Sequence, residues 1–211
     1  MNSPGTGLGT VLGVWAHPDD EAYLSSGLMA RAVDAGVRVV CLTATRGEGG
    51  SLDPERWPPQ TLGSVRESEL LRSLAHLGVT EHRFLGLPDV DWHTPLPSEG
   101  AALVEQAVAE VKPDVVLTFG PDGVTGHEGH KSVSRWTTDA MAQVEGAEPQ
   151  LYYAVYARSW AEEFLPLIEP HGVFMDGAEP PVVADEAVDV LVYLDDHEIS
   201  RKMTALKEHQ S

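Results

Sequence analysis

A histidine and three consecutive acids follow the first apolar run of the chain. In the stretch GVWAHPDDEA, His17 and a proline lead directly into Asp19, Asp20 and Glu21. Adjacent carboxylates raise one another's pKa, and burying them without a cation is costly. A divalent metal ion would turn the same acids into partners of the largest charge in the site. The stretch alone fits a second interpretation equally well, in which Asp19 or Asp20 caps a helix and Glu21 favours its dipole.

A second stretch, GHEGH, supplies two more histidines. His127 and His130 are spaced i, i+3 and lie on one face if a helix begins there. Two histidine nitrogens and one aspartate oxygen leave coordination positions for water and substrate, which is typical of catalytic zinc. The same ligand types also hold non-haem Fe(II). The two clusters together therefore predict a metal site with an open face.

The elements that must position these residues alternate between strands and helices. One predicted helix ends at Gly36. Another begins at a capping box formed by Ser64 and Glu67 and ends at Gly78. This order predicts an α/β fold with a Rossmann-like open, mostly parallel sheet and helices on both faces. A region over 157–182 is expected to be irregular. The expected strands are 10–16, 37–44, 82–87, 114–119, 151–156 and 187–195, and the expected helices are 21–36, 64–78, 99–111, 128–142 and 197–210.

Both polar clusters follow predicted strands. In open parallel sheets, ligands bind beyond the carboxyl ends of the strands. The stretch HPDDE follows the first strand, TRGEGG follows the second, and GPDGVTGHEGH follows the fourth. The fold prediction and the residue chemistry therefore indicate the same edge of the sheet.

The bulk composition limits the classes of function. The 211 residues suit one domain over 1–211, and 33 acids against 14 Lys and Arg give a formal net charge of -19. Such a charge repels phosphate and anionic lipid, so we expect neither nucleic-acid nor membrane binding. The single Cys41 cannot form an internal disulfide. Without an evident signal peptide or membrane span, the expected location is cytoplasmic.

An ordered set of motifs resembles a known family. WAHPDDEA, LTATRGEGG, VRESELLRSLAHLG, LGLPD and GHEGHKSVSRW occur in that order between about residues 10 and 140. They resemble the LmbE-like (PIG-L) zinc-dependent N-deacetylases. The resemblance implies that His17, Asp20 and His130 bind Zn²⁺, with Fe²⁺ as the other candidate metal.

The resemblance also implies roles for residues around the metal. Asp19 would be the general base, and His127 would be the general acid or would stabilise the oxyanion. Glu48, Arg66 and Asp89 would bind the sugar. The residues themselves leave other roles open. Glu48 could equally be an exposed loop acid, Arg66 could form surface ion pairs, and Asp89 could be a turn residue.

The implied reaction removes an acetyl group from an N-acetylglucosamine-type conjugate, with a small-molecule N-acyl amino sugar as the binding partner. The alternatives are an amidase for larger acyl amides, such as thiol-conjugate amides, and a catalytically silent sugar-binding relative. Two positions depart from the family pattern: many relatives have an acid where this chain has Gly129, and some have a tyrosine at the position of Thr125. The chain also ends where relatives often continue, so the domain is expected to be shortened at the C-terminus. The sequence implies no particular oligomeric state.

Overall fold

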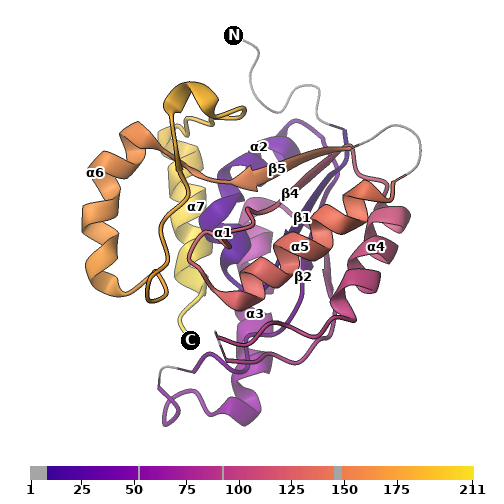
Figure 1. Ribbon diagram of the computed structural model, residues 1–211, viewed down its shortest axis with the longest axis vertical. Helices are drawn as coiled ribbons and strands as arrows, with labels where there is room; N and C mark the ends of the chain where they lie inside the picture. Colours follow the sequence, from indigo (N-terminus) through magenta and orange to yellow (C-terminus); the bar gives the residue numbers. More distant parts are fainter. Residues whose placement is uncertain (1–8, 52, 92, 145–148) are drawn as a thin grey trace.

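A five-stranded parallel sheet forms the core of the computed structural model, which describes residues 9–51, 53–91, 93–144 and 149–211. The strand order is β3-β2-β1-β4-β5, and every neighbouring pair is parallel (Figure 1). The predicted open parallel sheet is therefore confirmed. Its strands are β1 (Val11–Trp15), β2 (Val39–Thr43), β3 (Glu81–Phe84), β4 (Val115–Phe119) and β5 (Gln150–Ala154).

The three central strands are buried along their whole length. Every residue of β1, β2 and β4 is buried, which explains why their sequences are continuous apolar runs without alternation. The order also places β1 at the point where the winding reverses, because β2 and β3 lie on one side of it and β4 and β5 on the other. This reversal is the position at which such sheets bind ligands.

Helices cover both faces of the sheet, as predicted (Figure 1). On one face α4 packs against α5, and on the other α3 packs along α7 with α2 beside them. Hydrophobic side chains from both helix layers and from the sheet form one continuous buried cluster. The bounds are α2 (Ser26–Asp34), α3 (Pro59–Leu77), α4 (Gly100–Val111), α5 (Glu128–Ala142) and α7 (Asp196–Glu208).

The helix predicted over 21–36 is two helices. A short helix, α1 (Asp20–Leu24), ends at Ser25, and α2 begins at the next residue. Ser25 leaves the helical conformation with φ of -135°, and its hydroxyl donates to the Glu21 carbonyl at 3.1 Å. A serine side chain that binds the backbone in this way competes with the helical hydrogen bonds, which accounts for the break.

The predicted start of the next helix is also wrong. Helix α3 begins at Pro59, so Ser64 lies in the helix interior, where its carbonyl accepts from the Ser68 hydroxyl. Glu67 forms an ion pair with Arg46 instead of a capping box. A proline is favoured at the first helical position because its missing N–H would have no partner there. The predicted end at Gly78 is confirmed by its left-handed φ of 78°.

The strand predicted over 187–195 does not form. A short 3-10 turn, η2 (Asp185–Ala187), is followed by irregular chain as far as the capping box that Asp195 and Glu198 form at the start of α7. Leu194 packs against Gly27 of α2. Leu194 therefore faces a helix, whereas Val190, Leu191 and Tyr193 are exposed, and the segment pairs with no strand of the described chain.

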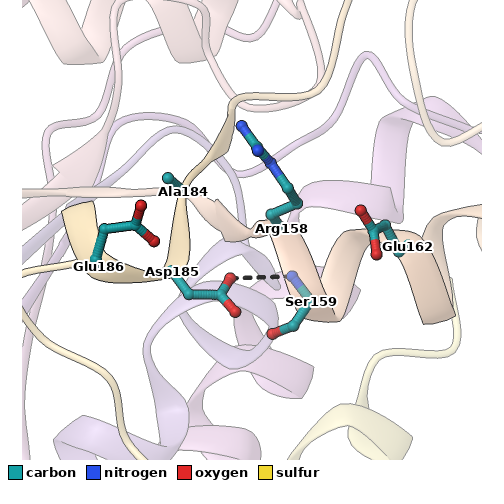
Figure 2. Close-up of a pocket in the computed structure, with 6 residues that line it drawn as sticks. All are labelled: Arg158, Ser159, Glu162, Ala184, Asp185 and Glu186. Atoms are coloured by element: carbon teal, nitrogen blue, oxygen red, sulfur yellow. Dashed lines mark hydrogen bonds between the residues drawn. The ribbon is translucent and has the colours of Figure 1, made fainter.

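The region 157–182 is more regular than predicted. It contains α6 (Arg158–Ile168) and the turn η1 (Glu169–His171), and the short strands β6 (Tyr156–Ala157) and β7 (Val182–Val183) pair beside them. Trp160, Phe164 and Leu167 recur at helical spacing, a signal that the predicted irregular region overlooked. At the start of α6, the Asp185 carboxylate accepts from the backbone N–H of Ser159 at 3.0 Å beside a small surface pocket (Figure 2).

Among the described residues, no helix has both the length and the apolar character needed to cross a bilayer.

Candidate metal centre and catalytic site

The two polar clusters meet at the carboxyl ends of β1 and β4. These strands are neighbours, so the loop after Trp15 and the loop after Phe119 lie side by side. The Phe119 ring stacks on His130 with 4.2 Å between ring centroids, and Trp15 meets Phe119 edge-on at 5.2 Å. The buried aromatic side chains of the sheet therefore form a rigid floor beneath the histidine.

The loop after β1 aims Asp20 at this floor. The Asp20 Oδ2 atom accepts hydrogen bonds from the backbone N–H groups of Ala16 (3.1 Å) and His17 (2.8 Å). Asp19 occupies the cap position of α1 but makes no capping hydrogen bond with its side chain. The cap position predicted for Asp19 is therefore confirmed, but its carboxylate is not used for capping and is free for another role. The two aspartates point different ways, which leaves Oδ1 of Asp20 directed at the second loop.

His130 presents an unprotonated nitrogen to Asp20. Its Nδ1 lies 2.9 Å from the carbonyl oxygen of Gly123, and a carbonyl can only accept, so Nδ1 carries the proton. The neutral ring then has its lone pair on Nε2, which lies 3.3 Å from Asp20 Oδ1 and 3.2 Å from His17 Nδ1. Burial, followed by the charge of His17, lowers the pKa of His130 to about 3 and favours this neutral form.

His17 is oriented by a second carboxylate. Its Nε2 lies 3.4 Å from Asp89 Oδ1, and its Nδ1 faces the cluster at 3.7 Å from Asp20 Oδ2. Burial by itself would lower the pKa of His17, but the contact with Asp89 and the charge of Asp20 outweigh it and raise the pKa. A carboxylate on the far nitrogen of a histidine is the common arrangement around metal-binding histidines.

The three side chains fit a metal ion. Bonds of about 2.0–2.2 Å in a tetrahedral centre require ligand atoms roughly 3.3 Å apart. Nδ1 of His17 lies 3.2 Å from Nε2 of His130, which lies 3.3 Å from Oδ1 of Asp20, and the other Asp20 oxygen, Oδ2, lies 3.7 Å from Nδ1 of His17. All three residues are buried. A lone pair of His130 that faces a carboxylate oxygen is repulsive without a cation between them. These three side chains are therefore close enough to share one ion, and their role as ligands stays a prediction.

His127 lies beside these ligands but differs in its hydrogen bonding. Its ring stacks on His130 at 4.8 Å, and His17, His127 and His130 offer nitrogen atoms within 4.8 Å of one another. However, Nδ1 of His127 accepts the backbone N–H of Gly129 at 3.0 Å, which leaves the proton on Nε2. Burial and the charge of His17 lower its pKa to about 3. A protonated Nε2 suits a hydrogen-bond donor better than a metal ligand.

Asp19 is held by an arginine at the mouth of the site. Arg66 on α3 donates to Asp19 Oδ2 at 3.1 Å and to the carbonyls of Pro18 (3.0 Å) and Gly47 (3.1 Å). Burial and the neighbouring Asp20 raise the pKa of Asp19, whereas Arg66 opposes this shift. Asp19 keeps about a third of its side chain exposed, at 30%. Its carboxylate is thus oriented and open to a ligand.

The three residues predicted to bind sugar surround this site. Arg66 holds Asp19, and Asp89 contacts His17 while its Oδ2 accepts from the backbone N–H of Gly49 at 3.0 Å. Glu48 accepts from the backbone N–H of Asp89 through Oε1, and its buried Oε2 has no hydrogen-bond partner among the described residues. Arg66 and Asp89 are therefore engaged with candidate catalytic and metal-binding side chains.

The two departures from the family pattern also lie in this site. Glu128, one residue before Gly129, forms an ion pair with Lys131 at 2.9 Å and makes no hydrogen bond to His127. Glu128 is therefore engaged with Lys131 and not with His127. The Thr125 hydroxyl lies 3.3 Å from Nδ1 of His130.

Sequence reasoning missed two residues behind the site. Glu21 was expected only to favour the start of a helix, yet its side chain is completely buried and its Oε2 accepts from the backbone N–H of Asp19. His209, near the end of the chain, lies 3.5 Å from Glu21. Nothing in the sequence connects positions 188 residues apart, so this contact could not have been found without the fold.

A parallel α/β sheet with clustered imidazoles and carboxylates at its switch point defines a class of protein with a candidate open metal centre. Comparison with known families assigns the chain within this class. Residues 12–141 match the family described as PIG-L, GlcNAc-PI de-N-acetylase. The chain belongs to this family.

Individual relatives extend the similarity beyond the matched region. A 1D-myo-inositol 2-acetamido-2-deoxy-alpha-D-glucopyranoside deacetylase of Acidothermus cellulolyticus is 32% identical over 95% of this chain and 78% of its own length. The enzyme of the same name from Kineococcus radiotolerans is 37% identical over 64% of this chain, which spans only 45% of that protein. The solved N,N'-diacetylchitobiose deacetylase of Pyrococcus horikoshii has the same fold, with a TM-score of 0.68, 19% identity and coverage of 99% of this chain and 72% of its own.

Proposed function

We propose that this protein is a metal-dependent N-deacetylase that hydrolyses the acetamide of an N-acetylated amino-sugar conjugate. The observation that carries the proposal is the division of roles among adjacent side chains. His17, Asp20 and His130 lie within 3.7 Å of one another, whereas Asp19 pairs with Arg66 and keeps 30% of its side chain exposed. The names of the curated relatives, which are deacetylases of an acetamido sugar joined to inositol, support this substrate class.

His17, Asp20 and His130 would hold the metal, with Zn²⁺ as the first candidate and Fe²⁺ as the second. When bound, such an ion supplies Lewis acidity, which lowers the pKa of a water and polarises the amide carbonyl. Asp89 keeps His17 in the required orientation by contacting its far nitrogen. Gly123 does the same for His130 through its carbonyl.

Asp19 would act as the general base. Its raised pKa lies closer to neutrality than that of an ordinary aspartate, which improves a carboxylate as a proton acceptor. Arg66 fixes the carboxylate through Oδ2 and leaves Oδ1 to receive the proton of the attacking water. The same proton is then available to the departing amine.

His127 would stabilise the developing oxyanion. Because Gly129 occupies its Nδ1, the ring offers an Nε2–H donor to the carbonyl oxygen of the substrate. One donor of this kind commonly contributes roughly 3–4 kcal/mol to the transition state. Glu48 has a buried oxygen without a partner in the described chain, and it is therefore the best placed of the predicted sugar-binding residues to accept a hydrogen bond from a sugar hydroxyl.

An amine-release assay with the purified protein tests this function. The zinc-loaded and the anaerobically iron-loaded proteins would be compared on N-acetylglucosaminyl inositol, on N-acetylglucosamine and on analogues with longer acyl groups, with bound metal measured in parallel. Release of acetate and amine from the acetylated conjugates is expected. No amine release from any acetylated amino sugar would contradict the proposal, and preferential release of longer acids would indicate an amidase.

The variant Asp19→Asn separates the base from the ligands. It should bind one equivalent of metal and lose about 100-fold or more of kcat, because general base catalysis contributes roughly 10²–10⁴-fold. Asp20→Asn should lose metal as well as activity. Asp139→Asn, the same change at an exposed position of α5, is the matched control and should retain both. Full turnover by Asp19→Asn would exclude Asp19 as the base.

A further inference from the structure

A buried carboxylate supports the backbone of Asp19 from behind. Glu21 has no exposed surface, and its Oε2 accepts the backbone N–H of Asp19 at 3.1 Å. Asp19 has a φ of 118°, a conformation that residues other than glycine rarely adopt and that persists only where the surroundings enforce it. The bond from Glu21 is one of the contacts that hold this turn.

Glu21 has little else to compensate its burial except a histidine from the far end of the chain. The hydroxyl of Ser73 donates to Oε1 at 3.4 Å, and Nε2 of His209 lies 3.5 Å from the same oxygen. His209 follows α7 directly, and its side chain is 8% exposed. Its Nε2 makes no hydrogen bond within the described chain, so its contribution to Glu21 is electrostatic.

A second buried acid fixes the segment that carries His209. Glu69 on α3 is 3% exposed, and its two oxygens accept from the backbone N–H of Gln210 (3.2 Å) and the hydroxyl of Ser211 (2.6 Å). Residues 209–211 are thereby held against α3 at two points. This attachment places the imidazole beside Glu21 and restricts its movement.

We propose that His209 is a positioning residue of the catalytic site: its imidazolium balances the charge of Glu21, and Glu21 holds Asp19 in its left-handed turn. A buried carboxylate without a counter-charge is strongly unfavourable and would move toward water or another partner. Loss of the His209 cation would therefore release the Asp19 turn. Although burial lowers the pKa of His209, the contact with Glu21 outweighs it and raises the pKa, which favours the cation.

The inference rests on the proposed function only where activity is measured, and amide hydrogen exchange at Asp19 tests it independently. His209→Gln removes the cation but keeps a polar side chain of similar size. The double variant Glu21→Gln/His209→Gln also removes the buried charge, while the glutamine oxygen can still accept from Asp19. His197→Gln makes the same change at an exposed position near the start of α7 and serves as the matched control.

In His209→Gln, we expect the Asp19 amide to exchange about tenfold faster or more, and kcat for amine release to fall by a similar factor with KM unchanged. In the double variant, both the exchange rate of the Asp19 amide and kcat should return to within about threefold of the wild type, because the two residues are coupled. His197→Gln should match the wild type. If His209→Gln does not fold, folding of the double variant supports the pairing, and failure of both to fold contradicts it.

Unchanged Asp19 exchange in a folded His209→Gln variant would overturn the proposal, as would a double variant whose losses multiply. A wild-type protein that releases no amine would contradict the proposed function alone. The exchange measurement would still decide the role of His209 in that case.

Discussion

Arg66 has two possible roles that differ at the level of single atoms. Its Nη atoms donate to Asp19 Oδ2 and to the carbonyls of Pro18 and Gly47, which joins the proposed base, the loop that carries it and the loop after β2. The family resemblance implies instead that Arg66 binds the sugar. A positioning role affects turnover, whereas a substrate contact of equal strength in ground and transition states affects only KM.

The variant Arg66→Lys distinguishes these roles. Lysine cannot reproduce the planar fork that reaches three acceptors, and the loss of one charge-assisted hydrogen bond costs about 1.5–3 kcal/mol. We expect kcat to fall roughly 10-fold or more, with metal content unchanged. Steady-state kinetics would be compared with Arg83→Lys, a control in an exposed ion pair with Glu110. A higher KM with normal kcat would instead assign Arg66 to the sugar.

At the scale of elements, the sheet and α5 could be predicted because their signals are local. The continuous apolar run of β4 and the two histidines that begin α5 are visible in any short window of sequence. The elements that differ from prediction depend on tertiary contacts. The break at Ser25 depends on a side-chain hydrogen bond, and the segment before Asp195 has strand-like residues but packs against α2.

In the candidate site too, some features could be predicted from local sequence and others depend on tertiary contacts. The proximity of His17, Asp20 and His130 could be predicted because the carboxyl ends of parallel strands meet at one edge of the sheet. The partners that set the protonation of these side chains could not, because they are backbone groups or distant acids. The carbonyl of Gly123, which places the proton of His130 on Nδ1, is an example, because a backbone carbonyl leaves no distinctive pattern in the sequence.

The edge strand β3 carries a pH-dependent contribution to stability. Burial lowers the pKa of His82 from 6.5 to about 4, and its Nε2 lies 3.0 Å from the hydroxyl of Thr43. Since the unfolded chain takes up this proton first, the contribution is complete above pH 6.5 and is lost as the pH falls toward 4. The loss should be on the order of 3 kcal/mol.

Urea unfolding of the wild type and of His82→Gln between pH 7.5 and 4 would measure this contribution. The free energy of unfolding of the wild type should fall more steeply than that of the variant over this range. His171→Gln, at an exposed position, should follow the wild type. Parallel curves for the wild type and His82→Gln would show that His82 titrates normally in the folded protein.

At the scale of the whole molecule, the formal net charge of -19 acts against the compact state. Several ion pairs are exposed, including Arg38–Glu81 and Arg83–Glu110, and such pairs contribute only about 0–1 kcal/mol each. Salt screens both the attraction within these pairs and the repulsion among the excess acids. Because the repulsion involves many more charges, its relief should dominate.

Raising NaCl from 10 to 150 mM at pH 7.5 shortens the Debye length from about 30 to 8 Å. We therefore expect the Tm of the metal-loaded protein to rise by roughly 3–6 °C over this range. KCl at the same ionic strength should give the same rise, because screening depends on ionic strength and not on the identity of the ion. A difference between the two salts would indicate specific cation binding by the acidic surface. A Tm that falls with both salts would mean that the attraction within the ion pairs outweighs the repulsion among the acids. The unpaired acids would then have to lie far enough apart on the surface that their repulsion lowers the stability only slightly.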